Sequence, residues 1–118
     1  MKYLCLFYGE EQKLDAMSKP DADRLTDDCL SYDDVLAKSG HLVLAQALQS
    51  VRTATSVRVR DDEVDVFDGP FAETKEQLLG FILIEAKDKN DAINVASNSP
   101  LARLGTAELR PVLKLRED

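Results

Sequence analysis

An α+β fold is predicted by three features of this 118-residue chain. Two short runs, residues 2–8 and 80–85, are apolar on both faces of an extended strand, which is typical of strands covered on both sides. A long amphipathic segment, residues 18–39, lies between them. The other strand-like runs are separated by turns and by one shorter helical segment. We therefore expect one domain, residues 1–118, that mixes strands with helices.

The first predicted helix covers residues 18–39. Ser18 can cap it, and Pro20 and Asp21 suit its first turn. Its apolar residues recur at spacings of three and four and form one stripe: Ala22, Leu25, Cys29, Tyr32 and Leu36. A single stripe indicates a helix that packs with one face on a sheet. Gly40 is suited to end the helix.

A hairpin is predicted after a strand at residues 42–48. If the turn is Asp61-Asp62, three cross-strand pairs follow: Val59–Val64, Val57–Val66 and Arg58–Asp65. One face of the hairpin is then all valine, and the other face pairs opposite charges. A slip of one residue would destroy this match. Asp–Asp is not the favoured sequence for a two-residue turn, so the loop length stays open.

The second helix is predicted at residues 88–98, with Asp88 as its cap and Pro100 after its end, and the last strand at residues 106–112. The resulting order, β-α-β-(β-β)-β-α-β, is that of a ferredoxin-like split βαβ domain with an inserted β-hairpin. Two helices cover only one face of a four-stranded sheet. Because strands 2–8 and 80–85 are apolar on both faces, we expect a homodimer that packs sheet to sheet.

Composition narrows the range of partners. The net charge is −7, which argues against nucleic acid and against an anionic membrane surface as partners. No run approaches the roughly 20 apolar residues that span a bilayer. We therefore expect a cytoplasmic protein, in which the two widely spaced cysteines, Cys5 and Cys29, stay reduced.

The connection at residues 68–76, Asp-Gly-Pro-Phe-Ala-Glu-Thr-Lys-Glu, is the first candidate site. A carboxylate beside a lysine in a partly closed cleft can act as a general acid or base. In this interpretation Asp68 or Glu73 is the base and Lys75 is its electrostatic partner. In the structural alternative, Asp68-Gly-Pro forms a tight turn, Phe71 anchors it, and Glu73, Lys75 and Glu76 are solvated or salt-bridged.

Substrate-binding roles are predicted for a set of neighbouring residues: Tyr8, Phe71, Thr74, Glu76 and Arg110. Tyr8 is alternatively a packing residue, and Arg110 alternatively pairs with a glutamate across the sheet. The single histidine, His41, is expected to lie exposed in a loop and cannot form a zinc site by itself. Because the sequence has no nucleophile motif and no glycine-rich phosphate loop, no cofactor and no metal are predicted.

Three stretches together resemble the DGPF or YCII-related family: residues 1–8, residues 68–76 with their continuation through 80–81, and residues 108–112. Residues 54–60 also resemble the hairpin of that family, so the resemblance covers nearly the whole chain. It implies a small bacterial protein, a ferredoxin-like subunit and a dimeric α/β barrel. By association it also implies a link to extracytoplasmic-function sigma factors.

The resemblance further implies, for the YCII branch, a His–Asp pair that this chain does not match. The first helix contains no histidine, and Ser99 stands before Pro100 where an aspartate is expected. Two functions stay open. One is a small-molecule lyase or isomerase that uses an acid/base pocket at the DGPF loop. The alternative is a non-catalytic homodimer that binds a small-molecule ligand or has a regulatory role. This role would be linked to sigma-factor-dependent transcription control.

Overall fold

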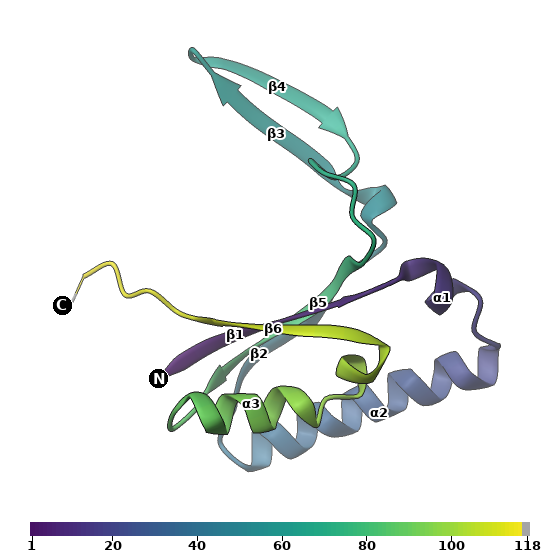
Figure 1. Cartoon of the computed structure of the whole chain (residues 1–118), viewed down its shortest axis with the longest axis vertical. Helices are drawn as coiled ribbons and strands as arrows, with labels where there is room; N and C mark the ends of the chain where they lie inside the picture. The colour runs from purple at the N-terminus through teal and green to yellow at the C-terminus, as the bar shows by residue number, and fades with distance from the viewer. Residues whose placement is uncertain (117–118) are drawn as a thin grey trace.

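The computed structural model describes residues 1–116 and contains one antiparallel four-stranded sheet with a separate hairpin. The sheet strands, in spatial order, are β2 (Leu42–Ala47), β5 (Gln77–Glu85), β1 (Lys2–Gly9) and β6 (Gly105–Pro111). Helices α2 (Lys19–Lys38) and α3 (Lys89–Ser97) lie together on one face of this sheet (Figure 1). The predicted α+β class and the predicted order of these elements are confirmed, and both are consistent with a ferredoxin-like subunit.

Helix α2 has the caps that its sequence predicts. Ser18 Oγ accepts a hydrogen bond from the backbone N–H of Asp21 at 3.3 Å. Gly40 follows the helix with a φ of +81°, a left-handed conformation that glycine adopts without strain. The Tyr32 hydroxyl donates to the backbone oxygen of Val95 at 2.6 Å, which ties α2 to α3. The apolar stripe therefore faces the sheet.

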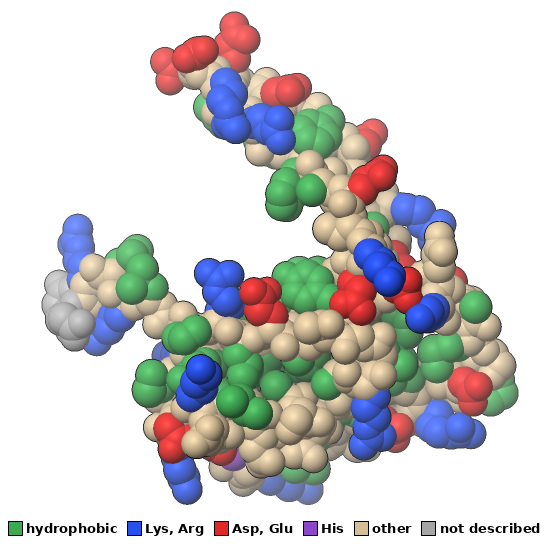
Figure 2. Space-filling view, in the orientation of Figure 1, with side chains coloured by type: hydrophobic (Ala, Val, Ile, Leu, Met, Phe, Trp, Pro, Cys, Tyr) green, Lys and Arg blue, Asp and Glu red, His purple; other side chains and the backbone are tan. Residues whose placement is uncertain are grey.

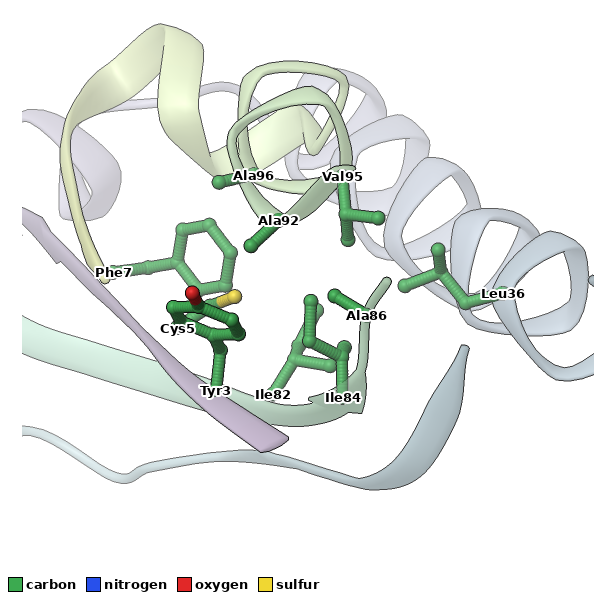
Figure 3. Packing of buried hydrophobic residues seen from close by; sticks show 10 residues of the cluster. All are labelled: Tyr3, Cys5, Phe7, Leu36, Ile82, Ile84, Ala86, Ala92, Val95 and Ala96. Atoms are coloured by element: carbon green, nitrogen blue, oxygen red, sulfur yellow. The ribbon is translucent and has the colours of Figure 1, made fainter. Parts of the chain in front are cut away.

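The core lies between the helices and the sheet (Figure 3). Three alternate residues of β1, Tyr3, Cys5 and Phe7, point into it, and β5 contributes Ile82 and Ile84. Alternation along a strand sends every second side chain to the same face. The helices supply the buried residues that cover this face: Leu36, Ala92, Val95 and Ala96.

The hairpin of β3 (Thr55–Arg60) and β4 (Glu63–Asp68) projects away from the sheet, on the side opposite the helices (Figure 1). Its register is the predicted one, with Val59 opposite Val64 and Arg58 opposite Asp65. The turn has two residues, Asp61 and Asp62, and both have positive φ, at 51° and 64°. This conformation matches the right-handed twist of a hairpin even without the favoured Asn-Gly.

Several short elements differ from the predictions. A short helix, α1 (Glu11–Asp15), lies between β1 and α2 and was not predicted. Strand β5 begins at Gln77, three residues before the predicted start. Two short 3₁₀ helices, η1 (Val51–Thr53) and η2 (Pro100–Leu104), were also not predicted. Such elements are too short for an apolar period to show in the sequence.

The second face of the sheet carries no helix within residues 1–116 (Figure 1). It is apolar along the central strands β1 and β5 and polar along β6, where Arg110 and Glu108 lie opposite Leu4 and Leu6. Leu4 lies opposite Leu83, and Leu6 lies opposite Phe81. Leu83 is also opposite Leu44, which is 45% exposed. Directly paired residues share a face, so these side chains form one surface, called here the open face.

Candidate functional site

A cavity of about 450 Å³ lies between α2 and the sheet. Its walls come from three parts of the chain: α2, the strands β1, β2 and β5, and the segment that follows α3. The lining is mostly apolar and includes Phe7, Leu25, Ala45, Ile82 and Leu101. Its size and character match those of small-molecule sites, which range from roughly 300 to 1,000 Å³ and are lined mainly by hydrophobic groups.

Small side chains create this cavity. Cys29 belongs to the inward stripe of α2, and Ala45 and Ala47 lie on the edge strand β2. Protein interiors are normally packed about as densely as organic crystals. Three short side chains where α2 crosses β2 leave a gap that larger residues would fill. The sequence shows these residues, but only the packing of α2 on β2 brings them together.

The polar groups of the cavity include Asp33, Cys29 and Thr26, all from α2. Partial burial, with a smaller contribution from the neighbouring Asp34, raises the pKa of Asp33. Burial also raises the pKa of the Cys29 thiol, and Asp33 and Asp28 add to this effect. A protonated thiol is a poor nucleophile, so Cys29 is suited to packing against a ligand rather than to attacking one.

Ser99 also lines the cavity and is almost fully buried, at 3% exposure. It stands before Pro100, the position at which the YCII branch is expected to carry an aspartate. The cavity therefore contains the position of one predicted catalytic residue, with a hydroxyl in place of a carboxylate. A serine hydroxyl can orient a ligand by hydrogen bonding, but its pKa is far too high for it to act as the missing acid.

The first part of the 68–76 connection forms a structural turn at the base of the hairpin. Gly69 has a φ of +99°, and its N–H donates to the backbone oxygen of Ala54 at 2.7 Å. The Ser56 hydroxyl donates to the oxygen of Gly69, also at 2.7 Å. These bonds fix the turn, whereas Phe71 is 80% exposed and is not an anchor for the turn within residues 1–116.

The second part of the connection lines a smaller cleft of about 310 Å³. Of the predicted site residues, Thr74 and Lys75 belong to its lining, together with Glu10, Glu11 and Arg52. The Glu11 carboxylate accepts hydrogen bonds from the Ser50 hydroxyl at 2.6 Å and from the Val51 N–H at 2.9 Å. Glu11 therefore joins α1 to η1 and helps to hold the base of the hairpin.

The other predicted site residues lie outside both hollows. Asp68 is exposed at the end of β4, and Glu73 is exposed in the loop. Glu76 is half-buried, and its carboxylate accepts a hydrogen bond from the Thr106 hydroxyl at 3.0 Å. Tyr8 and Arg110 lie on β1 and β6 and share the open face with Leu4 and Leu6. The catalytic and substrate-binding roles of these residues stay predictions.

Sequence reasoning missed a linkage of three residues between α2 and α3. His41 is half-buried; its Nδ1 lies 2.7 Å from Ser39 Oγ, and its Nε2 lies 3.1 Å from both carboxylate oxygens of Asp91. Backbone donation from Lys87, and then the side chain of His41, lower the pKa of Asp91. None of the three residues lines either hollow, which indicates that the linkage is structural and holds α3 against the end of α2. Fifty residues separate His41 from Asp91, and no local pattern signals such a contact.

A metal centre is not formed among residues 1–116, where no group of three or more potential His, Cys, Asp or Glu ligands is clustered. Over the same residues, no helix combines the length and the apolar character needed to cross a membrane.

Comparison with known proteins gives two matches. The family described as "YCII-related domain" matches residues 1–116. A curated relative, the uncharacterised protein R00369 of Rhizobium meliloti (strain 1021), is 35% identical over 114 residues. The aligned region covers 95% of this chain and 92% of the relative. The two chains are therefore similar over nearly their full lengths.

Proposed function

Since this chain belongs to the YCII-related family, we propose that it is a homodimeric module that binds a small, largely apolar molecule in the cavity between α2 and the sheet. The cavity itself is the observation that carries this proposal: about 450 Å³ of mostly apolar lining with a few polar groups. A preformed hollow of this kind is the usual location of a ligand site.

The ligand class follows from the polar groups in the wall. Asp33 can accept a hydrogen bond or pair with a cation, and Thr26 and Ser99 offer hydroxyls. With Asp33 inside the wall and a net charge of −7 on the chain, an anionic ligand is disfavoured. The ligand expected here has an apolar body and a donor group, such as an amine.

Homodimer formation is supported by the open face. Leu4, Leu6, Phe81 and Leu83 give this face an apolar centre that no helix of the described chain covers, bordered by the polar residues of β6. Large contiguous apolar patches on a soluble protein are normally interaction sites. A second copy offers the same patch, and a two-fold axis pairs the two faces. The dimeric α/β barrel expected for the family would have this arrangement.

The cavity can be tested with N-phenyl-1-naphthylamine, a neutral probe whose fluorescence rises in apolar sites. Cys29→Phe should fill the cavity and lower the probe's affinity at least tenfold. Val35→Phe is the matched control, because Val35 lies on the same helix, is 57% exposed and does not line the cavity. Equal loss of binding in both variants, or in neither, would contradict a site in this cavity.

Proton-transfer catalysis at the signature loop is the second candidate function, favoured by the cleft in which Lys75 lies near Glu10 and Glu11. If this candidate is correct, a metabolite screen should find turnover that Lys75→Ala abolishes. Lys89→Ala, at the exposed start of α3, should leave that turnover intact. Full turnover by Lys75→Ala would show that Lys75 takes no part in the reaction. The suggested link to sigma factors rests on the family resemblance alone and stays a prediction.

A further inference from the structure

The β3–β4 hairpin has no partner within its own described chain. Its valine face is exposed, with every member of the set more than half accessible: Val57, Val59, Val64 and Val66. The two strands form their own sheet, so the outer edge of each is unpaired. A two-stranded hairpin standing alone is marginally stable in water and normally gains a third strand or a packing surface. An unpaired edge also offers a row of backbone donors and acceptors to another chain.

The segment after β6 has the pattern of such a third strand. Residues 112–116 leave the sheet without regular secondary structure and bend at Leu115 (Figure 1). Leu113 and Leu115 are 79% and 88% exposed, and they alternate with the basic residues Lys114 and Arg116. Alternation of this kind gives a strand with one apolar face and one charged face. We call residues 112–116 the tail.

We propose that the tail of one copy adds to the outer edge of β4 in a second copy, antiparallel, with Lys114 opposite Asp65. This register produces five matched pairs: Val112–Phe67, Leu113–Val66, Lys114–Asp65, Leu115–Val64 and Arg116–Glu63. The leucines then extend the valine face, and the basic residues meet the acidic residues of β4. The pairing rests on the homodimer proposed above and specifies how its two copies interlock.

Charge and direction distinguish this register from its alternatives. Strand β3 carries Arg58 and Arg60, so a tail beside β3 would oppose like charges. A parallel tail beside β4, with Lys114 again opposite Asp65, would place Val112 against Glu63 and Arg116 against Phe67. Figure 2 shows the acidic side chains gathered at the tip of the hairpin and basic side chains near the tail. Only the antiparallel β4 register matches every residue of the tail.

The distance between the two segments requires a second copy. The tail begins beside Lys2, since the Val112 N–H donates to the Lys2 oxygen at 3.0 Å. The hairpin departs from the other end of β1, where Gly9 pairs with Gln77. The eight residues of β1, at a rise of roughly 3.3 Å per residue, separate these points by about 23 Å, whereas the five tail residues reach at most about 18 Å.

A two-fold axis removes this separation. If two open faces meet with the axis perpendicular to β1, the start of β1 in one copy lies over its end in the other. Each tail then lies beside the partner's hairpin, and the contact occurs twice because a two-fold interface is isologous. The hairpin and the tail both lie on the side of the sheet away from the helices, as this arrangement requires (Figure 1).

Disulfide trapping between two differently tagged, co-expressed copies tests the register. In a Cys29→Ser background, one copy carries Leu113→Cys and the other carries Val66→Cys, while Cys5 stays fully buried. Opposed residues of an antiparallel pair have Cα atoms about 4.5–5.5 Å apart, within the range of a disulfide. Oxidised glutathione should therefore join the two tags on a non-reducing gel. Val57→Cys replaces Val66→Cys in the control, because β3 lies one strand further away, about 10 Å from the tail.

The possible results of this experiment distinguish a failure of the tail–β4 pairing from a failure of the homodimer. A disulfide formed with Val66→Cys and not with Val57→Cys supports the register. A dimer by light scattering that forms neither disulfide, or both equally, overturns the pairing while the homodimer stands. A monomer by light scattering overturns both proposals.

Charge reversal gives a second measurement that needs no cysteine. Lys114→Glu should weaken the dimer about tenfold in dissociation constant, because two attractive pairs per dimer become repulsive. Lys38→Glu, at the end of α2 on the helix side, should leave the constant within about twofold. Equal effects of the two substitutions would overturn the pairing.

Discussion

Asp33 is the residue whose environment most directly affects the proposed ligand. Burial and Asp34 raise the pKa of its carboxyl, so its charge is lost at a higher pH than for an ordinary aspartate. A cationic apolar probe such as dansylcadaverine should therefore bind the cavity less tightly as pH falls through that raised pKa.

Asp33→Asn tests this assignment. The variant should bind the cationic probe weakly at pH 7 and show a flat pH profile, which titration by fluorescence measures. Binding of the neutral probe should change little. A wild-type pH profile in Asp33→Asn would show that another group governs binding.

The pKa of Asp91 is shifted in the opposite direction to that of Asp33. The Lys87 N–H, and then His41, lower its pKa, so the linkage stabilises the fold above the ordinary aspartate pKa of about 3.9. The contribution is lost as pH falls through the lowered folded-state pKa. Asp91→Asn should therefore have a lower Tm than wild type at pH 7, and the two Tm values should converge toward pH 2.

The control for this prediction is Asp27→Asn, an exposed position on α2. Its Tm should follow that of the wild type across the same pH range. A gap between Asp91→Asn and wild type that stays constant from pH 7 to pH 2 would contradict the role given to the carboxylate.

At the scale of elements, the hairpin turn is the place where sequence and conformation agree least. Asp62 has a φ of +64°, which glycine adopts without a steric penalty. Asp62→Gly should therefore stabilise the hairpin by about 0.5 kcal/mol. Amide hydrogen exchange should slow in β3 and β4, whereas Glu63→Gly, inside the strand, should accelerate it. Faster exchange in Asp62→Gly would contradict this interpretation.

The longer elements were predictable because their patterns are local. Ser18 and Asp88 cap α2 and α3 as the sequence indicates, and the valine pairs fix the register of the hairpin. The helix α1 was not predictable, because five residues contain too little apolar periodicity. Its bonds from Glu11 to Ser50 and Val51 form only after distant segments meet.

At the scale of the whole molecule, the single chain is extended for its length. Its radius of gyration is 16.3 Å, against about 13.5 Å for a compact domain of 118 residues. The projecting hairpin and the tail account for this difference (Figure 1). Both features, together with the open face, would be accounted for by the second copy proposed above.

Leu83→Arg tests the open face. Leu83 lies opposite both Leu4 and Leu44, so a buried arginine there would be unpaired on both copies. Light scattering at micromolar concentration should show a dimer for the wild type and a monomer for Leu83→Arg. Val35→Arg, an exposed apolar position on α2, should stay dimeric. A dimeric Leu83→Arg would place the interface elsewhere.

The amino-acid sequence by itself determined the α+β class, the order of the long elements, the hairpin register and the family, because each depends on residues close in the chain or on a contiguous motif. The location of the candidate site, in contrast, follows only from the tertiary structure. The 68–76 motif marks a turn and one wall of a small cleft, whereas the larger cavity arises where Cys29 of α2 meets Ala45 and Ala47 of β2. Small residues in a sequence do not indicate a cavity, because the cavity exists only when packing brings those residues close together. The linkage of His41 to Asp91 has the same origin: it joins two segments that only the folded chain brings into contact.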